Sequence, residues 1–379
     1  MIRGLVVLAA VLVGCQGPEY PVAQMGGVSQ VDLTADNGRQ VVVDRDSTQY
    51  LGHPSTLLLE DGRTILAVYP EGHGRGPIVY KRSPDGGRTW SDRLDVPASW
   101  ATSQEVPTLF RTVDAEGIKR IVMFSGLYPI RTAVSEDDGA TWSELEPIGG
   151  FGGIVAMGSV ERLTDGRYLA FFHDDGRFIG PEGDAGQFYV YGSESSDGGL
   201  TWSAPRVLVT DPEVDLCEPG VVRSPDGTEL AMLMRENSRT RNSFLTVSTD
   251  EGATWSAHDE LPLALTGDRH TLRYLPDGRL IVVFRDMAEG SDSKGDWLAW
   301  VGTYEEMVSR EPAGLRIRIM DNQNSWDSTY PGVEVLPNGD VVTTTYGHWV
   351  EGEPPYIVSV RLTWKEMQDW IGRYSIGRQ

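Results

Sequence analysis

The chain has 379 residues, of which 40% are hydrophobic, and it carries a formal net charge of −22 at pH 7. A charge of this sign repels phosphate groups, so the composition argues against nucleic acid or an anionic membrane surface as a partner. With 11 tryptophans and only two cysteines, the folded part must be stabilised by packing rather than by disulfides.

The N-terminal residues predict export from a bacterial cytoplasm. Arg3 supplies a positive charge, residues 5–13 are apolar, and small residues lead to Cys15. The apolar run is shorter than the roughly 20 residues that a membrane-spanning helix needs. We therefore expect residues 1–14 to be a secretory signal peptide.

The end of this signal resembles the lipobox of bacterial lipoproteins, in the sequence Leu12-Val13-Gly14-Cys15. The resemblance implies that Cys15 is lipidated and that residues 15–35, rich in Gly, Pro and Gln, tether the protein in the periplasm or on the cell surface. Gln16, rather than aspartate, follows Cys15, so the outer membrane is the expected anchor. An ordinary signal peptide with an incidental cysteine is the alternative.

After a short predicted strand at residues 40–46, a two-residue turn pattern recurs through the chain. Each copy is flanked by alternating apolar residues, which is typical of a β-hairpin. The spacings are 55, 49, 61, 51 and 61 residues. The copies are Asp61-Gly62, Glu116-Gly117, Asp165-Gly166, Asp226-Gly227, Asp277-Gly278 and Asn338-Gly339.

A second motif, Ser-x-Asp-x-Gly-x-Thr-Trp, occurs four times, and its aspartates are 52, 60 and 53 residues apart. Ser and Asp side chains can bond the amides of a turn, Gly accepts a positive φ, and Trp packs beneath. One active site does not need four identical carboxylates on separate repeats, so we interpret the motif as structural. The aspartates are Asp85, Asp137, Asp197 and Asp250.

Six hairpins at this period predict an all-β fold, a six-bladed β-propeller of four-stranded antiparallel blades. The last repeat has strands near 332–336, 340–346 and 356–362 but no fourth, so we expect the strand at 40–46 to join it and close the ring. Residues 36–379 then form one domain, with a short helix near residues 365–374.

The repeated Asp motif resembles the Asp-box of sialidases and related β-propellers, over nearly the whole mature chain. In such a fold, residues that open the first strands and end the second strands converge on one face, which we call the mouth. Five of the six histidines fall there. The titratable residues expected at the mouth to bind substrate are His53, His73, His173, Asp174, Arg235, Arg269, His270, Arg285 and His348.

Two short segments extend the resemblance to the active site. Cys217-Glu218-Pro219, seventeen residues before Arg235, looks like the glutamate and the carboxylate-binding arginine of sialidases. Thr329-Tyr330-Pro331 looks like their tyrosine nucleophile. The resemblance implies that Glu218 takes the proton of Tyr330, while Arg235, with Arg269 or Arg285, binds a substrate carboxylate.

The chain departs from the sialidase pattern in its first repeat. Gly52-His53-Pro54 stands where the first arginine of the family is expected, and no aspartate lies between Gly62 and Pro84. We therefore predict Glu71, with His73 beside it, as the general acid. The incomplete set of arginines leaves the identity of the sugar open.

The sequence thus predicts a monomeric, exo-acting glycoside hydrolase of the sialidase type that cleaves a terminal acidic sugar from glycans with retention. A polysaccharide lyase using His53, His270, Tyr330 and Arg235 on uronic acids is one alternative. A non-catalytic glycan-binding propeller is another. No sequence pattern indicates a metal site or a cofactor.

Overall fold

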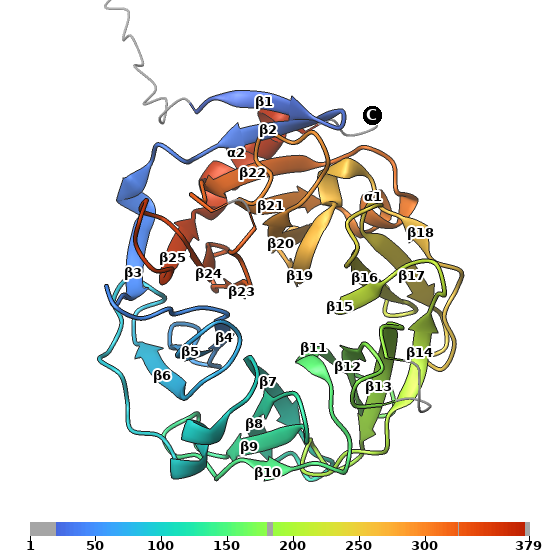
Figure 1. Cartoon of the computed structure of the whole chain (residues 1–379). Coiled ribbons are helices and arrows are strands. Elements are labelled where there is room, and N and C mark those ends of the chain that lie inside the picture. The colour runs from blue at the N-terminus through green and yellow to red at the C-terminus, as the bar shows by residue number, and fades with distance from the viewer. Residues whose placement is uncertain (1–19, 180–184, 325, 376–379) are drawn as a thin grey trace, which may run out of the picture.

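The computed structural model describes residues 20–179, 185–324 and 326–375 (Figure 1). Six sheets stand radially around a central axis, which confirms the predicted six-bladed all-β propeller. The predicted signal peptide at residues 1–14 and Cys15 lie outside the described residues.

The first three blades follow one another around the ring. Blade 1 contains β4 (Ser55–Leu58), β5 (Ile65–Pro70) and β6 (Ile78–Ser83). Blade 2 contains β7 (Pro107–Val113), β8 (Lys119–Ser125), β9 (Arg131–Ser135) and β10 (Glu146–Pro147). Blade 3 contains β11 (Ile154–Arg162), β12 (Tyr168–Asp174), β13 (Tyr189–Ser195) and β14 (Arg206–Thr210).

The last three blades include the N-terminal strands. Blade 4 contains β15 (Leu216–Arg223), β16 (Leu230–Glu236), β17 (Phe244–Ser248) and β18 (Asp259–Glu260). Blade 5 contains β19 (Gly267–Tyr274), β20 (Leu280–Asp286), β21 (Trp297–Gly302), β22 (Leu315–Met320), β1 (Val22–Met25) and β2 (Val28–Asp32). Blade 6 contains β23 (Gly332–Val335), β24 (Val341–Gly347), β25 (Tyr356–Leu362) and β3 (Gln40–Asp44).

In blade 1, the segment after β6 takes the place of a fourth strand. It has no regular strand geometry but is held to β6 by backbone hydrogen bonds. The amides of Ser91 and Leu94 donate to the carbonyls of Arg82 and Tyr80 at 2.8 and 2.9 Å. The chain therefore follows the outer edge of β6 before it crosses to blade 2.

The second strands β5, β12, β20 and β24 are buried along their whole length. Both of their faces are covered because each blade packs against two neighbours. This explains why their sequences are nearly continuous apolar runs rather than alternating ones, as in Ile65-Leu66-Ala67-Val68-Tyr69. The core consists of successive apolar layers between blades.

The Asp-boxes lie in the turns that follow the third strands of blades 1 to 4. In blade 3, Oδ1 of Asp197 accepts hydrogen bonds from the amides of Leu200 and Thr201 at 3.1 and 2.9 Å, and Oδ2 accepts from the Thr201 hydroxyl. The indole of Trp202 donates to the Gly199 carbonyl at 3.0 Å. The aspartates at positions 85, 137 and 250 make matching bonds to a threonine amide and hydroxyl.

The ring closes as the sequence predicted. Strand β3, from the N-terminal part of the chain, pairs antiparallel with β25, so blade 6 combines strands from both parts of the chain. The predicted terminal helix is α2 (Trp364–Tyr374), which begins at a capping box formed by Thr363 and Glu366. A shorter helix, α1 (Tyr304–Ser309), joins β21 to β22, and single 3₁₀ turns lie at Asn37–Arg39, Ala98–Thr102 and Leu263–Leu265.

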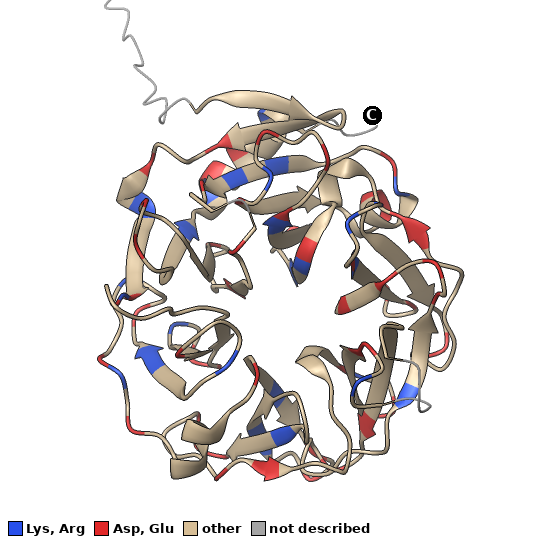
Figure 2. Cartoon of the chain, viewed as in Figure 1, with Lys and Arg blue, Asp and Glu red and all other residues tan. Residues whose placement is uncertain are grey.

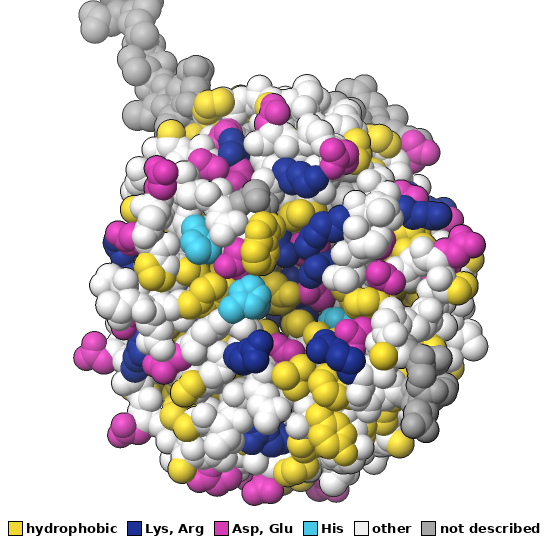
Figure 3. Space-filling view, viewed as in Figure 1, with side chains coloured by type: hydrophobic (Ala, Val, Ile, Leu, Met, Phe, Trp, Pro, Cys, Tyr) yellow, Lys and Arg dark blue, Asp and Glu magenta, His cyan; other side chains and the backbone are white. Residues whose placement is uncertain are grey.

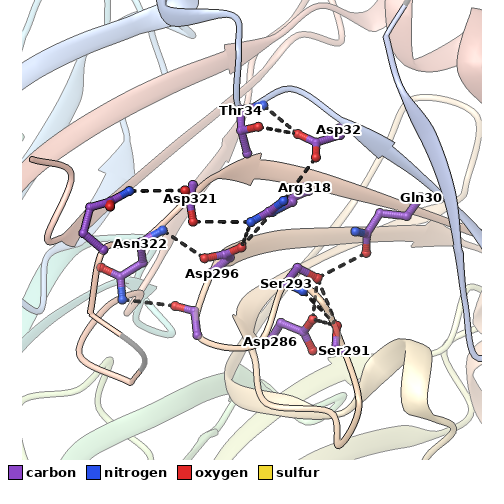
Figure 4. A network of polar contacts seen from close by, with 12 residues as sticks. Gln30, Asp32, Thr34, Asp286, Ser291, Ser293, Asp296, Arg318, Asp321 and Asn322 are labelled. Atoms are coloured by element: carbon purple, nitrogen blue, oxygen red, sulfur yellow. Dashed lines mark hydrogen bonds and ion pairs between the residues drawn. The ribbon is translucent and has the colours of Figure 1, made fainter.

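The described part of the predicted tether is not a free linker. Residues 22–32 form a hairpin, β1–β2, and β2 pairs parallel with β22 on the outer edge of blade 5 (Figure 1). The carboxylate of Asp32 contacts Arg318 at 3.2 Å (Figure 4). The Gln30 amide oxygen accepts from Arg316 at 2.8 Å. Val28 and Val31 are completely buried, so this segment belongs to the domain.

Charged side chains follow the loops around the ring, but acidic and basic residues also stand close to the axis on β19 (Figure 2). Among the described residues, no helix combines the length and the apolar character needed to cross a bilayer. The charges near the axis mark the region where the site is found.

Candidate active site

The inner strands are distorted where they reach the mouth. Five residues there have φ between 48° and 56°, in the left-handed region that side chains other than glycine rarely adopt. Register shifts mark the same place in β11, β15 and β19. Such strain costs on the order of 1–3 kcal/mol per residue and is concentrated at functional sites. The residues are His53, Val155, Glu218, Arg269 and Thr329.

Tyr330 and Glu218 form the centre of the site. The Tyr330 hydroxyl donates a hydrogen bond to Oε1 of Glu218, and the two residues are 8% and 3% exposed. Burial, and then the negative charge of Glu218, raise the pKa of Tyr330 well above its usual value. Burial opposes ionisation of Glu218, but Arg235, the hydrogen bond from Tyr330 and Arg269 together lower the pKa of that carboxyl. At rest the proton therefore lies on the tyrosine.

A group of arginines surrounds this pair. Arg235 contacts Glu218 at 2.9 Å and Asp268 at 3.2 Å. Asp268 also accepts from Arg285 at 2.5 Å and from Arg239 at 2.9 Å. Burial opposes the charge of Asp268, but Arg285, Arg235 and Arg239 together hold its pKa well below the usual range. Asp268 thus orients three guanidinium groups, and sequence reasoning did not identify it.

Arg269 lies against the nucleophile candidate from the other side. Its guanidinium carbon is 5.6 Å from the centre of the Tyr330 ring, and Nη2 donates to the Met157 carbonyl at 3.1 Å. Nη1 is buried and has no hydrogen-bond partner within the described residues. With Arg235, Arg239 and Arg285, this side of the mouth carries four positive charges against the two carboxylates of Glu218 and Asp268.

A second polar cluster is centred on Asp327, which the sequence analysis also missed. Its Oδ1 accepts from the hydroxyls of Tyr50 at 2.8 Å and Tyr346 at 3.1 Å, and its Oδ2 lies 3.1 Å from Nε2 of His348. Burial opposes its charge, but hydrogen bonds from His73, His348 and Tyr50 hold the pKa of Asp327 well below its usual range. Asp327 is only three residues before Tyr330, yet no motif includes it.

His53 joins the two clusters. Its ring centre is 4.5 Å from those of both Tyr330 and Tyr346, and 4.9 Å from that of His73. Three of the predicted mouth histidines, at positions 53, 73 and 348, therefore meet around Asp327. Figure 3 shows a hollow at the centre of the ring, with basic, acidic and histidine side chains gathered around it.

His173 lies behind Glu218 rather than in the open mouth. Its Nδ1 accepts from the Glu218 amide at 3.4 Å, and its ring stacks on Phe188 with centres 6.1 Å apart. Burial lowers the pKa of His173 to about 4. Asp174, next to it, is completely buried and accepts from the amides of Phe178 and Ile179, both at 3.0 Å. These contacts make both residues supports of the site.

Two predicted site residues are held elsewhere by their contacts. His270 bonds the Leu265 carbonyl at 2.8 Å through Nε2 and packs against Phe284, with ring centres 5.2 Å apart. Glu71 accepts from Arg93 at 2.6 Å, and Arg93 also binds Asp44 of the outer strand β3. The contacts of Glu71 thus face outward between blades 1 and 6, which argues against the prediction that it is the general acid.

Exposed aromatic side chains occur beside the mouth loops. Trp326 is 54% exposed and its ring centre is 6.3 Å from that of His73. Tyr128, 51% exposed, stacks on Phe178 with centres 6.3 Å apart. Flat aromatic surfaces of this kind suit the apolar faces of sugar rings. In the described part of the chain, no group of three or more His, Cys, Asp or Glu side chains is arranged to hold a metal ion.

Comparison with known proteins gives one curated relative, a sialidase from Paraclostridium sordellii that is 25% identical over 257 residues. The matched region spans 57% of this chain and 59% of that sialidase, so the chain covers little more than half of its relative.

Solved structures share the fold at low identity. A protein of unknown function from Dyadobacter fermentans has a TM-score of 0.69 at 17% identity, covering 85% of this chain and 97% of its own. An α-L-arabinanase from Penicillium chrysogenum has a TM-score of 0.62 at 16% identity, covering 86% and 98%. A leech intramolecular trans-sialidase has a TM-score of 0.59 at 15% identity, covering 84% and 69%.

Residues 130–341 match the family model described as a BNR repeat-like domain, more than half of the chain. These residues include three of the four Asp-boxes and the segment that carries Glu218, Arg235 and Tyr330. The chain therefore belongs to the BNR repeat-like domain family.

Proposed function

We propose that this protein is an exo-acting glycoside hydrolase of the sialidase type, which removes a terminal acidic sugar with retention of configuration. One observation carries the proposal: the Tyr330 hydroxyl donates to the Glu218 carboxylate, which also contacts Arg235 at 2.9 Å. A buried tyrosine with an ionised base beside it is a nucleophile ready to lose its proton.

The choice of tyrosine suits an acidic substrate. A sugar with a carboxylate beside its anomeric carbon repels an anionic nucleophile, whereas a neutral hydroxyl can approach. As the Tyr330 oxygen bonds the anomeric carbon, its proton passes to Glu218 and the bond to the leaving oxygen breaks. Water then releases the sugar from Tyr330, which recovers its proton from Glu218.

The excess of arginines supports recognition of an anion. Arg269 has a buried Nη1 donor without a partner in the described residues, next to Tyr330. Arg235 is oriented by contacts to both Glu218 and Asp268. Guanidinium groups fixed in this way bind carboxylates through paired hydrogen bonds. The 25% identity to a sialidase agrees with this chemistry, whereas the fold shared with an arabinanase leaves the identity of the sugar to experiment.

The test is a screen of 4-methylumbelliferyl glycosides of sialic acid, uronic acids and arabinofuranose. We expect an acidic glycoside to be cleaved with retention, and Tyr330→Phe to lower kcat on the order of 10³-fold with little change in Tm. Tyr69→Phe is the matched control, because Tyr69 of β5 is also buried but donates to Asp44 of β3 at 2.5 Å. Full activity of Tyr330→Phe would disprove the proposal.

The same screen separates the alternative functions. A lyase would release an unsaturated uronide that absorbs ultraviolet light. In the lyase set, Nε2 of His270 is bonded to the Leu265 carbonyl, which disfavours this alternative. A glycan-binding module would bind without turnover, and its affinity would not change in Tyr330→Phe.

A further inference from the structure

His73 has the geometry of a proton donor. It lies in the loop between β5 and β6, and its side chain is 56% exposed. Its Nδ1 is 2.8 Å from the Tyr50 hydroxyl and 3.4 Å from Oδ1 of Asp327. Its Nε2 has no hydrogen-bond partner among residues 20–179, 185–324 and 326–375. One ring nitrogen is therefore fixed by the protein, and the other is available to a substrate.

The hydrogen bonds around Asp327 determine which nitrogen carries a permanent proton. Asp327 is ionised and can only accept, so the single hydroxyl hydrogen of Tyr50 points to it at 2.8 Å. The Tyr50 oxygen can then only accept from His73, which must donate through Nδ1–H. Nε2 is consequently the atom that gains and loses a proton.

The two neighbouring histidines cannot act in this way. Nδ1 of His53 accepts from the Gly74 amide at 3.2 Å, and its Nε2 lies 3.1 Å from the Tyr346 hydroxyl, so both nitrogens are engaged. Burial lowers the pKa of His53 well below its usual value. Nε2 of His348 is already bonded to Asp327 at 3.1 Å. Of the three, His73 is the most exposed, with 56% of its side chain accessible against 20% for His348.

We propose that Nε2 of His73 is the general acid and base of the reaction, with Tyr50 and Asp327 as positioning residues. This inference rests on the proposed glycosidase function. The titratable groups that face His73 are Asp327, Tyr50 and His53. The ring of His53 contacts those of both His73 and Tyr330, with centres 4.9 and 4.5 Å apart, so His73 and the nucleophile lie beside the same ring.

The proton balance is complete with these groups. His73 Nε2–H protonates the leaving oxygen while its bond to the anomeric carbon breaks and Tyr330 attacks, and the tyrosine proton passes to Glu218. The neutral Nε2 then takes a proton from water as that water attacks the anomeric carbon. The bond to Tyr330 breaks, Glu218 returns the proton, and His73 is again an imidazolium.

The experiment compares two leaving groups on the glycone found in the screen. A glycosyl fluoride loses fluoride without protonation, whereas a methyl glycoside requires an acid. We expect His73→Gln to lower kcat/KM on the methyl glycoside about 10³-fold and on the fluoride less than about 10-fold.

His348→Gln is the matched control, because His348 binds the same carboxylate without a free Nε2. It should lower the activity on both substrates by one common factor. An equal effect of His73→Gln on the two substrates, or none, overturns the inference while leaving the glycosidase proposal intact. If the wild-type protein cleaves no glycoside, or Tyr330→Phe remains active, both proposals fall.

A readout independent of turnover is the nitrogen NMR spectrum of the His73 ring. The arrangement requires Nδ1 to stay protonated on both sides of the titration while Nε2 changes. A His73 ring whose neutral form carries the proton on Nε2 would contradict the inference even in an active enzyme.

Discussion

Six charged side chains share the floor of the mouth: Glu218, Arg235, Arg239, Asp268, Arg269 and Arg285. Glu218 contacts Arg235 and Tyr330, and Asp268 contacts three arginines. These contacts are needed because an unpaired charge at this depth would cost several kcal/mol. Three of the five left-handed residues at the mouth, at positions 53, 218 and 269, belong to the site. Local strain and buried charge are therefore placed where substrate contacts are proposed.

The burial of His173 gives a pH dependence of stability. Its pKa is about 4 in the folded protein and near 6.5 when unfolded, so the unfolded chain binds a proton more readily. Stability from this residue is complete above pH 6.5 and is lost as the pH falls towards 4. When the pH falls from 7 to 5, we expect the unfolding free energy of the wild type to fall by about 2 kcal/mol more than that of His173→Gln. Urea unfolding at both pH values measures the difference, and equal losses would contradict it.

At this scale the sequence predicted the residues that stand in a motif and missed those that do not. Glu218 and Tyr330 are flanked by proline in segments that resemble a known site. Asp327 and Tyr50 contact each other across 277 residues, and no repeat relates them. The contacts of Glu71 argue against its predicted role, because Arg93, in the segment after the Asp-box, binds it on the outer side of the blade.

Among the structural elements, the Asp-box turns connect the third strand of a blade to its outer edge. The Asp197 carboxylate satisfies two backbone amides and two hydroxyls, those of Ser195 and Thr201. Its removal leaves these donors without a protein acceptor.

We expect Asp197→Ala to lower the unfolding free energy by about 2 kcal/mol, measured by urea denaturation, without a change in kcat. Ser196→Ala is the control, because Ser196 is an exposed neighbour in the same turn. It should leave stability within about 0.5 kcal/mol. A loss of activity in Asp197→Ala at a temperature where it is folded would mean that the box does more than hold the turn.

The Asp-box turns could be predicted because they are determined by Gly, Asp and Thr residues that are close together in the sequence. The docking of the hairpin β1–β2 could not, since its partner β22 is distant in the sequence. Arg316 shows what the pairing provides: it is completely buried, and Gln30 of β2 and Asp286 of β20 bind its guanidinium at 2.8 and 2.6 Å. The described part of the supposed tether thus satisfies a charge in the core of blade 5.

For the whole molecule, closure of the ring depends on β3. Val43 is 2% exposed and packs with Leu51, Tyr69 and Ile357, whereas its neighbour Val42 is 50% exposed. The propeller should therefore respond very differently to the same substitution at these adjacent positions.

We expect Val43→Asp to destabilise the protein by about 4 kcal/mol or more, because it buries an unpaired charge in the closing strand. Val42→Asp should change stability by no more than about 0.5 kcal/mol. Thermal unfolding followed by circular dichroism measures both. Equal Tm values for the two variants would show that the ring does not rely on this strand.

The N-terminal chain enters two blades that are otherwise built from the C-terminal part: β2 lies on β22, and β3 lies on β25. Gln30 meets Arg316 only after 286 further residues have been added. During synthesis on the ribosome, β2 and β3 therefore have no partner strands until almost the entire polypeptide has emerged. The first four blades can form in order, but the ring can close only when the last two blades have been made. Nascent chains that stop early should therefore aggregate or be degraded.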